Sequence, residues 1–225
     1  MIPLRDRNPS GTFPVVTMAI ILANTVVFLY EVQLGPAIGA FLKHYALIPA
    51  MVTGSVRYNQ VGLADTIAPF FTSMFLHGGW LHLIMNMWFL WIFGDNIEDT
   101  LGAGRYLVFY VLCGLAAALT HIAVQPQSPV PVLGASGAIA GVLGAYAVMF
   151  PRARVLTLVP IFFFIRIMEL PALLILGYWF VLQIVSGSLE AVTATQGGTA
   201  IWAHVGGFLA GMALIFVMRP RKVEV

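Results

Sequence analysis

Apolar residues form six long stretches along the chain, and the segments between them hold nearly all of the charged residues and the Gly and Pro clusters. The stretches cover residues 14–34, 75–94, 105–124, 134–150, 168–186 and 199–218. A helix of about 20 apolar residues is long enough to cross a bilayer. The pattern therefore predicts an all-α membrane protein with six transmembrane helices. Residues 155–167 are also apolar but are interrupted by Pro160 and Arg166, so the pattern assigns them no clear element.

Basic residues are distributed unequally between the two sides of this bundle. Of the 11 Lys and Arg residues, only Lys43 and Arg57 fall on the side away from the termini. Because cytoplasmic loops carry an excess of basic residues, we expect both termini to be cytoplasmic. The long connection over residues 35–74 would then be external, with part of it in the membrane interface as an amphipathic hairpin. No clear signal-peptidase site follows the first stretch, which is interpreted as a retained helix.

The composition narrows the class of protein further. Hydrophobic residues make up 60% of the chain and charged residues only 9%, whereas soluble globular proteins have about 25% charged residues. This excludes a soluble domain, a disordered chain and a nucleic-acid module built on a basic face. The single cysteine, Cys113, can form no intramolecular disulfide.

Polar side chains inside membrane spans are costly, so each is a candidate functional residue. Four stand out: His82 and Asn86 in the second stretch, Ser136 in the fourth and His204 in the sixth. With cytoplasmic termini, these three stretches all run from the outside inward. A helix rises 1.5 Å per residue, so the four side chains lie at a similar depth, roughly 5–15 Å below the external surface.

This layer of polar residues is suited to acyl transfer. A serine hydroxyl becomes a nucleophile when a base takes its proton, and histidine is the usual base, so Ser136 and His204 form the candidate pair. His82 and Asn86, four residues apart on one helix face, could donate hydrogen bonds to the oxyanion that develops on the attacked carbonyl. No carboxylate lies in the same layer, which favours a dyad over a triad.

The same residues are also compatible with a purely structural role. Ser136 lies among Gly134, Gly137 and Gly141, and His204 precedes Gly206 and Gly207; such ridges of small residues usually serve close helix packing. Packing of the two ridges against each other would also bring the serine and histidine together, so the two interpretations are compatible. The HExxH motif is absent and the histidines are scattered, so no metal is expected. No other cofactor is implied, because the proposed chemistry needs only water. Repeat symmetry, typical of many transporters, is not apparent.

Three motifs in order resemble those of one family. Residues 77–86 (HGGWLHLIMN) resemble the second-helix HxxxN element of the rhomboid intramembrane serine proteases, residues 134–137 (GASG) their GxSG motif, and residues 203–211 (AHVGGFLAG) their AHxGGxxxG motif. The similarity extends from about residue 14 to 218. It implies a six-helix rhomboid-like bundle of the basic prokaryotic form, with residues 1–225 as a single membrane domain.

The resemblance also implies an activity. Ser136 would be the nucleophile, His204 the general base and acid, and His82, Asn86 and the Ser136 backbone N–H the oxyanion donors, with Gly134 allowing close approach of the backbone. The substrates would be membrane-spanning proteins, cleaved in or near their transmembrane segments, and the location a prokaryotic cytoplasmic membrane. Lipid would be a further partner, and no nucleic acid or metal is implied. The alternative is a non-catalytic membrane protein that binds other transmembrane helices.

Hydrolysis at this depth requires access of water from the external side. The external connection over residues 187–199 contains Gly187, Gly197 and Gly198 as candidate hinges, so this segment is predicted to act as a lid.

Overall fold

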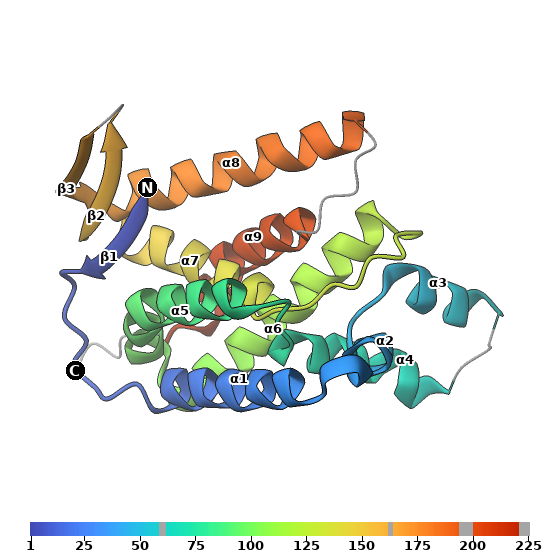
Figure 1. Ribbon diagram of the computed structural model, residues 1–225. Coiled ribbons are helices and arrows are strands. Elements are labelled where there is room, and N and C mark those ends of the chain that lie inside the picture. Colours follow the sequence, from blue (N-terminus) through green and yellow to red (C-terminus); the bar gives the residue numbers. More distant parts are fainter. Residues whose placement is uncertain (59–61, 162–163, 194–199, 221–225) are drawn as a thin grey trace.

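The computed structural model of the chain is mostly helical (Figure 1). It describes residues 1–225 except 59–61, 162–163, 194–199 and 221–225. The helices and strands of the described residues are β1 (Ile2–Asp6), α1 (Val15–Gln33), η1 (Gly35–Ala37), α2 (Ile38–Tyr45), α3 (Pro49–Tyr58), α4 (Leu63–Thr72), η2 (Ser73–Phe75), α5 (Trp80–Leu101), α6 (Ala103–Val124), α7 (Ser136–Met149), β2 (Arg154–Ile161), β3 (Phe164–Pro171), α8 (Ala172–Thr193) and α9 (Ile201–Met218). Each of the six predicted apolar stretches corresponds to one of the helices α1, α5, α6, α7, α8 and α9.

Four segments of the described chain are long and apolar enough to cross a membrane. They are Val15–Gln33, Ala103–Val124, Ala172–Leu189 and Ile201–Met218. Helix α7 has only 14 residues, and α5 carries several polar side chains along its length. The prediction of six spans therefore stays a prediction for these two helices.

Helix α7 lies at the centre of the bundle, between α5, α6, α8 and α9 (Figure 1). Every residue from Gly137 to Ala147 is buried. At 1.5 Å per residue, its 14 residues span about 21 Å, against about 30 Å for the hydrocarbon core of a bilayer. A helix of this length does not reach across the hydrocarbon core by itself.

Glycines bring α7 and α9 into backbone contact. A Cβ atom on Gly207 would overlap the carbonyl oxygen of Gly137, and one on Gly211 would overlap that of Gly141. On the other side of the interface, a Cβ on Gly144 would overlap the carbonyl oxygen of Phe208. The predicted close packing of the two glycine ridges is confirmed.

The connection between α1 and α5 contains three short helices, α2, α3 and α4, in its described part. It packs on the loop that leads into α7: Leu47 and Val132 form an isolated β-bridge, and the Thr53 hydroxyl donates a hydrogen bond of 2.8 Å to the carbonyl oxygen of Pro126. These contacts fix the chain just before Ser136. The position of this connection in the membrane interface stays a prediction.

The all-α prediction needs one correction, because β1, β2 and β3 form an antiparallel sheet in that order. Within residues 155–167, to which the sequence pattern assigned no element, residues 155–161 lie in β2 and residues 164–167 in β3, and Arg154 pairs with Pro171 at the open end of the two strands. Since β3 ends at Pro171, α8 begins at Ala172 rather than at the predicted residue 168. The third strand comes from the distant N-terminal segment, and a pattern of apolar residues does not reveal such pairing.

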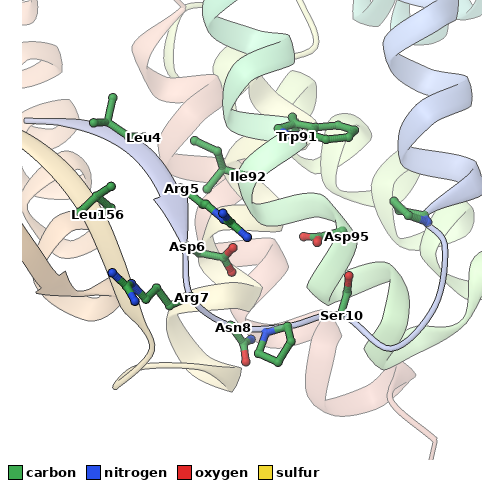
Figure 2. A pocket seen from close by; sticks show the side chains of 12 residues that line it. Leu4, Arg5, Asp6, Arg7, Asn8, Ser10, Trp91, Ile92, Asp95 and Leu156 are labelled. Carbon is green, nitrogen blue, oxygen red and sulfur yellow. The ribbon is translucent and has the colours of Figure 1, made fainter.

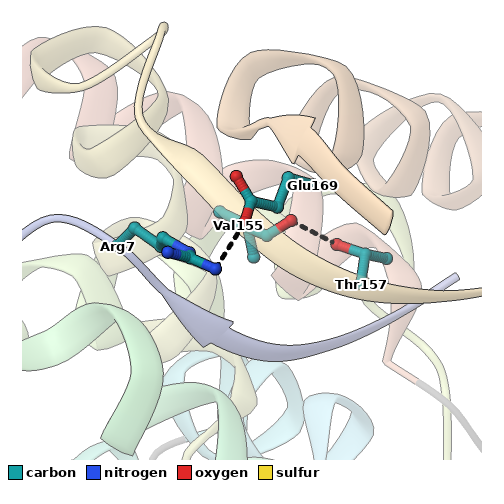
Figure 3. Close-up of polar contacts among 4 residues, drawn as sticks. All are labelled: Arg7, Val155, Thr157 and Glu169. Atoms are coloured by element: carbon teal, nitrogen blue, oxygen red, sulfur yellow. Dashed lines mark hydrogen bonds and ion pairs between the residues drawn. The ribbon is translucent and has the colours of Figure 1, made fainter. Parts of the chain in front are cut away.

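Two kinds of contact hold β1 at the edge of this sheet. Its backbone pairs with β2, with Ile2 opposite Leu158, and the Arg7 guanidinium forms an ion pair of 2.6 Å with Glu169 across β2 (Figure 3). The sheet lies at the end of the bundle where α5 ends and α8 begins (Figure 1).

Side chains of α5 and α7 fix the N-terminal segment to the helices. The Tyr146 hydroxyl donates to Asp6 Oδ2 at 2.7 Å, and the Trp88 indole N–H donates to the carbonyl oxygen of Pro3 at 2.7 Å. The buried Glu98 carboxylate accepts the backbone N–H groups of Val16 and Thr17, each at 2.8 Å, and so caps the start of α1. The acidic residues at the end of α5 therefore have structural partners.

Candidate active site

Ser136 is the first residue of α7, and the two residues before it set its position. Gly134 has a φ of 118°, a conformation that favours glycine, and its N–H donates to the carbonyl oxygen of Ser73 at 2.9 Å. A Cβ atom at Gly134 would lie 2.8 Å from Nε2 of His82. The absence of a side chain therefore lets His82 approach the backbone beside the serine.

His204 lies in the first turns of α9, opposite the start of α7. Its Nε2 atom is 2.8 Å from Oγ of Ser136, a hydrogen-bond distance. The two residues are 68 positions apart in the sequence, and the glycine contact between α7 and α9 brings them together. The structure thus joins the two residues that the sequence analysis paired.

His82 and Asn86 lie one turn apart on α5. The backbone N–H of Gly78 donates to Nδ1 of His82 at 3.4 Å, so in the neutral ring the proton is on Nε2, the ring nitrogen nearer Gly134. The Nδ2 atom of Asn86 is buried and has no hydrogen-bond partner among the described residues. A Cβ at Gly134 would lie 3.5 Å from it. Two N–H donors therefore face the chain next to Ser136.

These residues share a cavity of about 630 Å³ between α5, α7, α8 and α9. Its lining includes all four predicted polar residues: His82, Asn86, Ser136 and His204. Apolar side chains such as Met85, Phe89 and Leu143 form the rest of its wall. The arrangement is a serine–histidine pair and two side-chain donors in a mostly apolar cavity large enough for a peptide segment.

The comparison with known sequences agrees with these motifs. Residues 64–221, more than half of the chain, match the Rhomboid domain. The chain belongs to the rhomboid family. The recognition made from the three motifs is thereby confirmed, and the chain is an integral membrane protein.

Relatives of this rhomboid include a plant, a yeast and a bacterial protein. It is 32% identical over 188 residues to RHOMBOID-like protein 5 of Arabidopsis thaliana, covering 84% of this chain and 52% of that protein. It is 37% identical over 91 residues to the mitochondrial Rhomboid protein 1 of Saccharomyces cerevisiae, covering 39% of this chain and 26% of that protein. Rhomboid protease GluP of Bacillus subtilis is 40% identical over 74 residues, 33% of this chain and 14% of GluP. The rhomboid chain spans about half the length, or less, of these relatives.

Two residues beside His204 were missed by the sequence analysis. Oε1 of Gln183, on α8, is 2.8 Å from Nδ1 of His204, and the Trp179 ring lies 5.8 Å from the imidazole, centroid to centroid. Gln183 could have been found by the argument used for the other four residues, because it is an amide within an apolar stretch. Trp179 carries no such signal, since aromatic residues are common in membrane helices.

The remaining histidines near the site have other surroundings. The His77 backbone N–H donates to the Glu31 carboxylate at 3.1 Å, and its ring Nδ1 lies 3.3 Å from the carbonyl oxygen of Phe75. His121 is buried in α6. Neither residue is part of the cavity lining.

The rhomboid has a second, larger cavity of about 760 Å³ near the sheet. Figure 2 shows Asp6 of β1 and Asp95 of α5 beside it, with Arg5 and Trp91 nearby. Among the described residues that line this cavity there is no histidine, so Ser10 has no imidazole base within that set. Its size alone does not make it a site for acyl transfer.

The predicted lid is only partly within the described structure. Gly187 lies in α8, where a Cβ would stand 3.1 Å from Ile201 and 3.2 Å from the Trp202 ring. In this structure Gly187 allows close packing of α8 on α9, and its role as a hinge stays a prediction. Gly197 and Gly198 lie outside the described residues.

Proposed function

We propose that this rhomboid is an intramembrane serine endopeptidase that hydrolyses peptide bonds in or near the transmembrane segments of membrane-protein substrates. The observation that carries the proposal is the 2.8 Å contact between Ser136 Oγ and His204 Nε2 in a cavity that His82 and Asn86 also line. A second support is the resemblance to GluP, which is named a protease.

In the proposed mechanism Ser136 Oγ attacks the substrate carbonyl carbon while His204 Nε2 takes the hydroxyl proton. The imidazolium then donates that proton to the leaving amine, the peptide C–N bond breaks, and an acyl-enzyme ester on Ser136 remains. Water next attacks the ester, His204 removing a proton from it. Collapse of the second tetrahedral intermediate releases the carboxylic acid and returns the proton to Ser136.

The negative oxygen of each tetrahedral intermediate would be stabilised by three donors. His82 would donate through Nε2, because Nδ1 accepts the Gly78 N–H. Asn86 would donate through Nδ2, which is buried without a partner among the described residues. The backbone N–H of Ser136 is at the N-terminus of α7, where helix N–H groups are free and favour negative charge. Preorganised donors of this kind are often the largest contribution to catalysis.

We further propose that α5 and α7 complete a bundle of six spans within a single membrane domain. Burial of α7 among other helices would shield its ends from lipid, and its shortness would place Ser136 below the external surface with a water-filled space above it. By the excess of basic residues on one side, both termini would be cytoplasmic. The relatives reported above include a mitochondrial and a bacterial protein, and we propose a prokaryotic cytoplasmic membrane for this chain. Its partners would be lipid and transmembrane substrates.

Labelling with a fluorophosphonate tests the proposal without knowledge of the substrate. Purified wild-type protein in detergent should be labelled, and Ser136→Ala and His204→Ala should not. Ser186→Ala, which removes an exposed serine of α8, is the matched control and should be labelled like the wild type. The wild type and Ser186→Ala should also cleave a transmembrane substrate that is reconstituted with them in liposomes. Ser136→Ala and His204→Ala should not cleave it.

Folded wild-type protein that neither reacts with the probe nor cleaves a panel of transmembrane substrates would overturn the protease proposal. That outcome would favour the alternative, a non-catalytic protein that binds other transmembrane helices.

A further inference from the structure

Helix α8 presents one face to α9, and Gln183 lies on that face. Trp179, one turn earlier, packs against the His204 ring. Phe180 stacks on Phe208 with ring centroids 4.5 Å apart. Gly187, one turn later, leaves space for the side chains of Ile201 and Trp202. These contacts fix α8 against α9 over more than two turns, so Gln183 is held opposite His204 rather than placed there by a flexible side chain alone.

Ser136, His204 and Gln183 form a continuous chain of hydrogen bonds. Gln183 Oε1 is 2.8 Å from Nδ1 of His204, and Nε2 of the same ring is 2.8 Å from Ser136 Oγ. A carbonyl oxygen can only accept a hydrogen bond, so Nδ1 carries the proton of the neutral ring. Nε2 then has a free lone pair directed at the serine hydroxyl.

We propose that Gln183 is a positioning residue that selects the Nδ1–H tautomer of His204 and fixes the orientation of its ring. The inference rests on the proposed function and adds to it a third member of the serine–histidine pair, which the sequence analysis treated as a dyad. The opposite arrangement, with the Gln183 amide N–H donating to Nδ1, would put the imidazole proton on Nε2. That ring could not accept the proton of Ser136.

An amide suits this place in a membrane bundle better than the carboxylate found in soluble triads. A carboxylate without a cationic partner carries a high desolvation cost inside a membrane protein. A neutral amide gives the same geometric selection of the tautomer at lower cost. It stabilises the imidazolium less than a carboxylate does, so the contribution to the rate should be smaller than the roughly 10⁴-fold associated with the aspartate of the soluble triad.

Gln183 is not part of the lining of the cavity around Ser136. Its replacement should therefore affect the chemical step more than substrate binding. In Gln183→Met, which keeps the length of the side chain and removes the acceptor oxygen, we expect kcat to fall about 10- to 100-fold with KM unchanged. Gln183→Glu keeps an acceptor oxygen at the same length and should recover at least part of the lost kcat. Leu182→Ala, on the exposed face of α8, is the control and should retain wild-type kcat.

The direct test is ¹⁵N NMR of histidine-labelled protein in detergent, with the His204 signals assigned by their loss in His204→Ala. The expected wild-type spectrum has Nδ1 protonated and Nε2 unprotonated. Gln183→Met should give a mixture of both tautomers, and Gln183→Glu should restore the wild-type pattern. If Gln183→Met does not fold, Gln183→Asn, whose shorter side chain removes the amide from hydrogen-bond reach, takes its place.

The outcomes separate this inference from the proposed function. Wild-type kcat together with an unchanged His204 tautomer in the Gln183 variants would overturn the role of Gln183 and leave the protease proposal intact. A wild-type protein without probe reactivity or cleavage would overturn the protease proposal, while the NMR comparison would still show whether Gln183 selects the tautomer.

Discussion

The carbonyl oxygen of Gly141 on α7 occupies the place where a Cβ atom of Gly211 on α9 would stand. The two helices therefore touch through their backbones, and this contact lies about one and a half turns from Ser136 and two turns from His204. Because the separation of the helices sets the distance between the two side chains, the glycine contact and the proposed chemistry are directly connected.

Gly211→Ala is expected to separate α7 from α9 and to weaken both stability and activity. The added methyl group must displace backbone, which typically costs about 1–3 kcal/mol, and a shift of about 1 Å at Ser136 should lower cleavage by about 100-fold. Thermal unfolding in detergent and cleavage in liposomes measure the two effects. Gly177→Ala on α8 is the control, because no atom lies within 4 Å of its added Cβ. Equal unfolding temperatures and equal cleavage rates for Gly211→Ala and Gly177→Ala would contradict the proposed importance of the contact between α7 and α9.

Asn86→Ala should reduce the cleavage rate by about 10²–10³ with little change in stability. The reason is that Nδ2 of Asn86 has no partner among the described residues in the resting protein, so its removal breaks no hydrogen bond there and removes one proposed oxyanion donor. Rates of substrate cleavage in liposomes, compared with thermal unfolding, test this. The matched change Asn24→Ala removes a buried amide bonded to its own helix at Ile20, and should lower stability rather than rate. A rate for Asn86→Ala within threefold of wild type would argue against the donor role.

The buried cap of α1 should contribute strongly to stability. Glu98 is 3% exposed and accepts two backbone N–H groups at the start of α1. Glu98→Ala leaves both groups unsatisfied and should lower the free energy of unfolding by about 2–4 kcal/mol. Asp99→Ala, one position later, removes an exposed carboxylate that also accepts hydrogen bonds from the N-terminal segment, and should cost less than about 1 kcal/mol. Denaturation of the two variants in the same detergent gives the comparison.

The N-terminal segment should give the protein a pH-dependent stability. Burial is the main cause that raises the pKa of the Asp6 carboxyl from its ordinary 3.8 to about 6, while the hydrogen bond from Tyr146 opposes the rise and the nearby Asp95 adds to it. Between about pH 4 and 6 the folded protein then binds more protons at Asp6 than the unfolded chain does. The contribution of Asp6 to the free energy of unfolding therefore falls as the pH rises through that window and is constant above it.

Asp6→Asn should remove this part of the pH dependence. The free energy of unfolding should fall less between pH 4 and 7 than in the wild type, by about 1–2 kcal/mol. The difference is no larger because the Asp6 carboxyl is still partly in contact with solvent. Tyr146→Phe should have the opposite effect and steepen the fall, since it removes the donor that stabilises the ionised carboxylate. Unfolding temperatures of the wild type, Asp6→Asn and Tyr146→Phe, measured at pH 4 and pH 7, test this prediction. The same change in unfolding temperature for all three proteins would refute it.

The β-sheet is the part of the fold that could not be predicted from the sequence. Residues 155–167 are apolar and rich in β-branched residues, yet a hairpin of this kind is stabilised only by the elements that it joins. Its edge is covered by β1, which is separated from it by about 150 residues. A local pattern carries no information about such a distant partner, so neither the sheet nor the start of α8 could be placed in advance.

The sequence by itself determined the six apolar helices α1, α5, α6, α7, α8 and α9 and where Ser136, His204, His82 and Asn86 lie along the chain, because runs of apolar residues in a membrane protein must satisfy their backbone hydrogen bonds as helices. It also determined the family, through three motifs at fixed places. Only the tertiary structure decided which atoms meet: the Ser136–His204 distance depends on glycine packing between α7 and α9, and the partner of His204 Nδ1 depends on the rotation of α8. Gln183 was visible in the sequence as a polar residue in an apolar stretch, but the packing of Trp179 and Phe180 directs it to His204, and that packing exists only in the folded bundle.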